Sequence, residues 1–114
     1  DNIMAIYANL TVDQGSEFEA SVDVIDGDGN AVDLSTFTYH GQIRKTYNSL
    51  TAVDFTVELD VSQLYTLNIS LSAAQSNAMK AGRYVYDVEV VSPSGTVTRV
   101  IEGQVELTPS VTRI

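Results

Sequence analysis

The feature that most constrains this chain is a period-two alternation of apolar and polar residues. Residues 18–24, 53–59 and 84–90 each place every second side chain on one apolar face. Because successive side chains of a β-strand point to opposite faces, such runs are typical of strands with one buried and one solvated face. Several strands of this kind, separated by turn residues, indicate a β-sandwich.

Seven strands are expected, at about residues 4–12, 17–25, 37–45, 53–60, 65–71, 83–92 and 96–107. Glycine-containing segments at 13–16, 26–30 and 93–95 supply turns between them. The last strand has inconsistent parity, because Ile101 shares a face with Arg99 while Val100 lies opposite. A β-bulge near Val100 would reconcile these positions. Pro109 ends this strand, since proline cannot donate to a ladder.

One short helix is predicted at about residues 73–80, before the sixth strand. Ser72 and Gln75 have the spacing of a capping box, in which each side chain bonds the other residue's backbone amide. Residues 81–82, Ala-Gly, supply a C-terminal stop. So short a helix needs packing to persist, and we expect Leu71, Ala74 and Met79 to provide it.

Length and charge limit the classes of function. The 114 residues form one expected domain, with a core at about 4–108 and a tail at 109–114. Fifteen acidic against six basic residues give a formal charge of −9, which argues against binding to nucleic acids and anionic membranes. No apolar run is long enough to span a bilayer, and residues 1–5 do not resemble a signal peptide. The absence of cysteine excludes disulfides and thiolate metal sites.

Two interpretations are open for residues 26–30, Asp-Gly-Asp-Gly-Asn. Asp26, Asp28 and Asn30 place side-chain oxygens at positions one, three and five, as in a twelve-residue calcium loop. The sixth and twelfth positions, however, hold Ala31 and Phe37 in place of glycine and glutamate. Turn chemistry accounts for the same residues without a metal. The alternative is a weak, non-helical calcium site that includes Asp33.

Other reactive side chains favour no catalytic, cofactor or metal site. His40 is the single histidine and lies on the polar strand face with Gln42 and Arg44, which suits a surface residue better than a triad or a zinc site. Paired carboxylates could serve a glycosidase, but these acids occupy the solvated phase of their strands. They are Glu17, Glu19, Asp23, Asp87, Glu89, Glu102 and Glu106.

Five of the six tyrosines fall into two groups. Tyr84 and Tyr86 lie on the inward face of their strand, where a buried hydroxyl needs a partner such as a backbone carbonyl near the preceding corner. Tyr7, Tyr47 and Tyr65 are better placed as outward rings, which a sugar-binding surface would require.

The order of elements resembles the immunoglobulin-like domain at the N-terminus of phage baseplate upper proteins, together with related small virion proteins of tailed phages, including marine cyanophages. The resemblance extends from about Leu10 to Arg113 and is carried by residues 12–16, 32–34, 41–45, 71–75 and 81–89. Its strongest part is a strand, a helical turn and a strand that opens with Gly-Arg-Tyr. The family is structural, so the resemblance implies an immunoglobulin-like fold and no catalytic residues.

We therefore expect a seven-stranded immunoglobulin-like β-sandwich that is not an enzyme. Its expected function is that of a structural component of a tailed-phage virion, in the baseplate, tail, neck or head surface, made in the bacterial cytoplasm. Its expected partners are other virion proteins, including further copies of itself. The alternative is a carbohydrate-binding or adhesion module.

Overall fold

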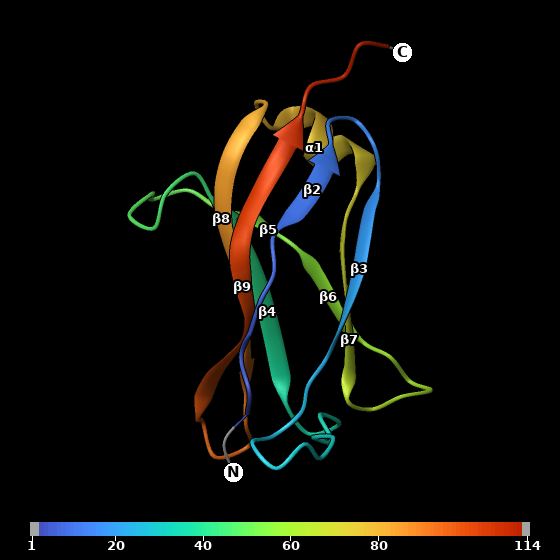
Figure 1. Ribbon diagram of the computed structural model, residues 1–114, viewed down its shortest axis with the longest axis vertical. Helices are drawn as coiled ribbons and strands as arrows, with labels where there is room; N and C mark the ends of the chain where they lie inside the picture. Colours follow the sequence, from blue (N-terminus) through green and yellow to red (C-terminus); the bar gives the residue numbers. More distant parts are fainter. Residues whose placement is uncertain (1–2, 113–114) are drawn as a thin grey trace.

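Two β-sheets face each other in the computed structural model, which describes residues 3–112, and one short helix lies at an end of the sandwich (Figure 1). The larger sheet contains β1 (Ile6–Tyr7), β2 (Leu10–Asp13), β4 (Thr38–Arg44), β5 (Val53–Asp54), β8 (Gly82–Val91) and β9 (Val97–Thr108). The smaller sheet contains β3 (Phe18–Asp23), β6 (Thr56–Leu59) and β7 (Thr66–Leu71), and helix α1 spans Ala73–Ala78. The predicted two-sheet β-sandwich is thus confirmed. Residues 1–2 and 113–114, the latter the end of the expected tail, lie outside the described residues.

The sheets combine parallel and antiparallel strand pairs. The larger sheet has the order β1-β9-β8-β4-β5, with β2 also on β9, and the smaller sheet has the order β3-β7-β6. Both β1 and β2 run parallel to β9, whereas the other paired strands are antiparallel. The single first strand expected at residues 4–12 is therefore wrong, because this segment forms two strands.

The break between β1 and β2 has a specific cause at Ala8 and Asn9. The Ala8 carbonyl turns away from the ladder and accepts a hydrogen bond from the Tyr86 hydroxyl at 2.7 Å. The Gln104 amide, left without that carbonyl, donates instead to Asn9 Oδ1 at 3.0 Å. Gly103 makes the arrangement possible, because a Cβ at this position would lie 2.0 Å from the Ala8 oxygen.

The strand expected at residues 53–60 is also divided. β5 pairs with β4 in the larger sheet, and β6 pairs with β7 in the smaller sheet, so the chain changes sheets at Phe55. The Phe55 amide still donates to the Gly41 carbonyl at 2.9 Å. Its ring is buried between the layers and meets the ring of Tyr86 edge-on, with 5.9 Å between centroids.

The predicted bulge in the last strand is confirmed at Val100. The register pairs Val88 with Ile101 and Glu89 with Arg99, which leaves Val100 without a partner on β8. The extra residue lets Val100 and Ile101, adjacent in sequence, both enter the core.

Helix α1 begins as predicted. The Gln75 amide donates to Ser72 Oγ at 3.1 Å, and the Ser72 amide donates to Gln75 Oε1 at 2.9 Å, which completes the capping box. Met79 is buried, but Ala74 is exposed, so the expected contact through Ala74 is wrong.

The helix faces the core with Ser76 instead. This side chain is fully buried, and its hydroxyl donates to the Ser16 carbonyl at 2.7 Å and accepts from the Gly15 amide at 3.0 Å. A polar residue in the core requires such partners. Ser76 therefore fixes the turn between β2 and β3 to the helix.

The core between the sheets is aliphatic, with Phe55 and Tyr86 as its buried aromatic residues. Its most deeply buried large side chains are Leu34, Ile43, Leu67, Ile69, Leu71, Leu107 and six valines. Across residues 3–112, the single helix is too short and insufficiently apolar to cross a bilayer.

Candidate functional site

The loop at residues 26–30 uses its first carboxylate to build a turn. Asp26 Oδ1 accepts hydrogen bonds from the amides of Asp28 and Asn30, each at 2.9 Å. Gly29 has φ +85°, a conformation that glycine adopts without steric cost. These contacts favour the turn interpretation over the calcium alternative.

Asp33 has a separate local role. Its Oδ1 accepts from the Ser35 amide at 2.9 Å, and the hydrogen bonds from Ser35 hold the Asp33 pKa below its ordinary value. Within residues 3–112, no group of three or more histidine, aspartate or glutamate side chains is arranged to hold a metal ion. Asp26 and Asp33 are thus not brought together as ligands.

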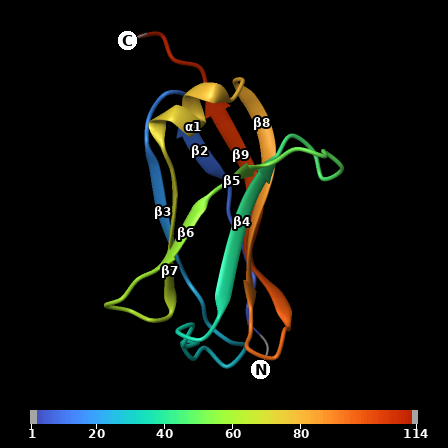
Figure 2. The ribbon, with the colours of Figure 1, turned by 180° about the vertical axis from the view of Figure 1, so that it is seen from behind.

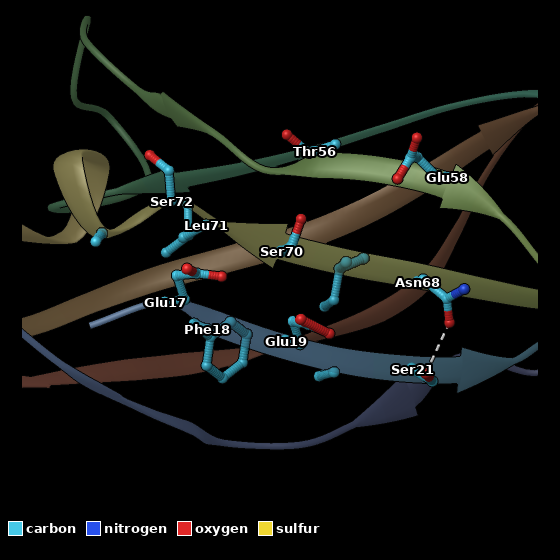
Figure 3. Close-up of a pocket in the computed structure, with 13 residues that line it drawn as sticks. Glu17, Phe18, Glu19, Ser21, Thr56, Glu58, Asn68, Ser70, Leu71 and Ser72 are labelled. Atoms are coloured by element: carbon cyan, nitrogen blue, oxygen red, sulfur yellow. Dashed lines mark hydrogen bonds between the residues drawn. The ribbon is translucent and has the colours of Figure 1, made fainter.

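The outer face of the smaller sheet carries a hollow with an acidic lining (Figure 3). The hollow has a volume of about 690 Å³ and includes Glu17, Glu19 and Glu58, which are all exposed. At the level of Glu58, the Ser21 hydroxyl donates to Asn68 Oδ1 at 2.8 Å. The predicted solvated face is confirmed, and Glu58 from β6 joins it because the register places β6 beside β7.

Farther along the same face, Asp23 accepts a hydrogen bond from the Thr66 hydroxyl at 2.7 Å. Hydrogen bonds from the Ser62 side chain and amide lower the pKa of Asp60, which lies in the loop after β6. Asp23 is exposed and Asp60 is half-buried, and both carboxylates serve as acceptors for hydroxyl, amide or basic groups.

The outer face of the larger sheet differs, because basic groups enter it. The strand register places Gln42, Asp87 and Glu102 in one row across β4, β8 and β9. Arg99 Nε lies 3.2 Å from Asp87 Oδ2, and Arg99 Nη1 lies 3.1 Å from Glu102 Oε1. Burial, followed by the charge of Glu89, raises the Asp87 pKa, and Arg99 opposes the rise.

A hollow of about 290 Å³ lies over this row. Its lining adds Arg44 and Tyr47 to the polar residues of the row. Arg44 donates from Nη2 to Gln42 Oε1 at 2.9 Å and from Nη1 to the Ser49 carbonyl at 2.7 Å. Gln42 in turn donates to Asp54 Oδ1 at 2.8 Å. These bonds connect the sheet face to the loop that presents Tyr47.

The tyrosines expected to point outward are distributed over the two sheets. Tyr47 is 78% exposed and lines the hollow on the larger sheet. Tyr7 is 66% exposed and pairs with Glu102 across β1 and β9. Tyr65 is half-buried immediately before β7 of the smaller sheet, so it does not join them.

Both inward tyrosines have carbonyl partners, as predicted. Tyr84 donates to the Lys80 carbonyl at 2.5 Å near the preceding corner, and Lys45 Nζ lies 4.7 Å from the centre of its ring. Burial raises the pKa of Tyr86, whose hydroxyl bonds Ala8, to about 12.

His40 and Glu106 occupy the positions expected of them. His40 is exposed on β4, where its register partner on β8 is Glu89. Glu106 is exposed on β9 opposite Arg83. Neither lines the hollow that contains Tyr47.

Two projecting loops carry apolar side chains that the sequence reasoning did not single out. Leu50 is 99% exposed in the loop after β4, and Val61 is 90% exposed in the loop after β6. Figures 1 and 2 show these loops, at residues 45–52 and 60–65, extending from opposite sides of the sandwich. Period-two patterning could not find them, because it describes strands.

No protein-family model and no curated protein matches the sequence. Solved structures do match. CopC from Methylosinus trichosporium OB3b is 13% identical, with a TM-score of 0.50, and the match covers 96% of this chain and 89% of CopC. The PKD domain of human KIAA0319 is 19% identical, with a TM-score of 0.45, and the match covers 99% of this chain and 87% of that domain. The likeness to CopC is one of fold, and the chain is an immunoglobulin-like β-sandwich with one short helix.

Proposed function

We propose that this protein is a non-enzymatic structural component of a tailed-phage particle that acts by assembling with other subunits. The observation that carries the proposal is the pair of apolar loop tips at Leu50 and Val61, which are almost fully exposed on projecting loops. Burial of one such side chain in an interface contributes about 1.5–3 kcal/mol. The choice of a phage particle rests on the sequence resemblance carried by residues 71–75 and 81–89.

Sheet edges offer a second means of association. β3 and β6 are the outer strands of the smaller sheet, and the unpaired amides and carbonyls of an outer strand can accept a further strand. Exposed glutamates on both strands, Glu19 and Glu58, limit indiscriminate pairing. Specific assembly would therefore combine an edge with an apolar loop tip, and repeated copies would form a closed symmetric ring or collar.

Solution mass tests the proposal. Light scattering should show a defined oligomer of the whole chain, and Leu50→Ser with Val61→Ser should shift the mass towards one chain. Asn48→Ser, a polar exchange in the same loop as Leu50, is the matched control and should keep the wild-type mass. A mass of one chain across the full concentration range, with no cosedimentation with purified virion proteins, would refute the proposal.

The alternative function, carbohydrate binding, is favoured by one observation. Tyr47 presents an exposed ring beside a hollow that is lined mostly by hydrogen-bond donors and acceptors. This activity would use the face of the larger sheet, so it is compatible with assembly through the loop tips.

A further inference from the structure

We infer that the hollow over the larger sheet binds one neutral sugar unit, with Tyr47 stacking on the sugar and the row of Gln42, Asp87 and Glu102 recognising its hydroxyls. The inference rests on the second candidate function and gives it a site and a ligand class. It is independent of assembly, which is judged by solution mass.

The polar lining of the hollow suits hydroxyl groups, because it offers donors and acceptors side by side. A sugar hydroxyl both donates and accepts one or more hydrogen bonds. Asp87 and Glu102 are acceptors, the guanidinium of Arg99 is a donor between them, and the Gln42 amide carries both functions. Hydrogen bonds to charged groups are about twice as strong as neutral ones, so this lining recognises a hydroxyl-rich ligand.

The charges of the hollow disfavour an anionic ligand. Three carboxylates and two guanidinium groups line it, a difference of one charge, and Arg99 is already paired with two of those carboxylates. An anion would be repelled by the surplus carboxylate and by the chain's formal charge of −9.

Tyr47 supplies the apolar component that a sugar ring needs. One face of a pyranose consists largely of C–H groups, which pack on the face of an aromatic ring. The loop that carries Tyr47 is anchored, because Arg44 bonds the Ser49 carbonyl at 2.7 Å and the Thr46 amide bonds Ser49 Oγ at 3.0 Å. These bonds fix the loop backbone beside the hollow, and most of the surface of the Tyr47 ring stays free for a ligand.

The hollow over the smaller sheet provides the internal contrast. It is larger, at about 690 Å³, and its charged residues are Glu17, Glu19 and Glu58 without any basic partner. No exposed aromatic ring is among its lining residues. A neutral sugar should consequently bind preferentially to the face of the larger sheet, beside Tyr47.

Chemical-shift titration with ¹⁵N-labelled protein tests the site. The neutral probes are tetrasaccharides of glucose, mannose, galactose and N-acetylglucosamine, and the acidic probe is an oligomer of sialic acid. Each is raised to about 10 mM, which is well above a millimolar Kd. We expect at least one neutral tetrasaccharide to shift the amides of Gln42, Tyr47 and Asp87, and the acidic oligomer to shift none of them. Tyr47→Ala should weaken the binding about tenfold, and Leu50→Ala, on the same loop but outside the hollow, should leave it unchanged.

Three results would overturn the inference. The first is the absence of shifts with every neutral probe. The second is binding that Tyr47→Ala does not weaken, and the third is shifts that concentrate on Glu19 and Glu58 of the smaller sheet. Amide spectra of the free variants report folding, so loss of binding in a folded Tyr47→Ala protein counts as support for the site.

Discussion

Replacing Gly103 with alanine should displace the segment Ala8–Asn9, between β1 and β2, from β9. Gly103 is a buried strand residue without positive φ, so alanine itself is compatible with the backbone there. On that basis alone, alanine would stabilise the protein by about 0.4–1 kcal/mol through the unfolded state. The added Cβ, however, would lie 2.0 Å from the Ala8 oxygen and 2.8 Å from its carbonyl carbon, and backbone cannot rotate aside as a side chain can.

The magnitude follows from the hydrogen bonds that the displaced segment would lose. Ala8 accepts from Tyr86 at 2.7 Å and donates to the Glu102 carbonyl at 2.9 Å, and Asn9 accepts from the Gln104 amide at 3.0 Å. At about 1 kcal/mol each, their loss costs about 3 kcal/mol, and the net destabilisation is about 2 kcal/mol. For a domain of this size the melting temperature should fall by about 8 °C.

Urea unfolding and amide exchange together provide the assay. Gly103→Ala should unfold at lower urea and lose exchange protection at Ala8 and Gln104. The comparison variant is Gly41→Ala, whose Cβ would meet only side-chain atoms, of Val88, Phe55 and Val57, at 3.0–3.3 Å. That variant should keep the protection at Ala8 and Gln104. Wild-type stability and unchanged protection in Gly103→Ala would refute the reasoning.

Perturbations at Ser76, Ser72 and Tyr86 also have clear signs. Ser76→Ala should destabilise the fold by about 1–3 kcal/mol, because the Gly15 amide and the Ser16 carbonyl lose a buried partner. Ser72→Ala should destabilise it by about 1 kcal/mol, because the helix loses its N-terminal cap. The midpoints of urea unfolding of the two variants measure this difference. Tyr86 has a folded pKa of about 12 against an ordinary value of 10, so its contribution is complete below about pH 10 and is lost as the pH rises to about 12. Stability measured across that range should fall, and Tyr86→Phe should reduce the fall; an identical slope in both proteins would contradict the assignment.

The alternation of residues could predict which side chains face the core, but not which strand lies beside them. Residues 53–59 show this limit, because the inward phase continues unbroken through Phe55 while the chain moves from one sheet to the other. The side chains of both halves point into the same interior, so the pattern is identical in either case. Partner choice depends on contacts between distant segments, which a local period does not contain.

The parallel first strands were missed for a related reason, although one signal was present. A glycine within a strongly patterned strand often marks a close approach of another backbone, and Gly103 has that role beneath Ala8. The buried Ser76 had no comparable signal, since serine in a short helix is ordinarily exposed. Its burial depends on the neighbouring turn at Gly15 and Ser16.

The candidate site could be predicted only as separate residues. Alternation placed Gln42, Asp87 and Glu102 on outward faces, and each was identified as a solvated polar residue. Their alignment in one row is set by the registers of β4, β8 and β9, including the bulge at Val100 that brings Arg99 opposite Glu89. Tyr47 joins the row through a loop whose path is fixed by Arg44.

The parallel attachment of β1 and β2 to β9 determines how the domain would respond to tension. The described chain begins at one end of the long axis and finishes at the opposite end, with its first and last strands side by side (Figure 1). A force applied between those ends acts along the paired strands, so their interstrand bonds are loaded in shear and must rupture together instead of peeling apart singly. Rupture under load is governed by the rate of unfolding, so such a geometry would make the domain a durable mechanical link.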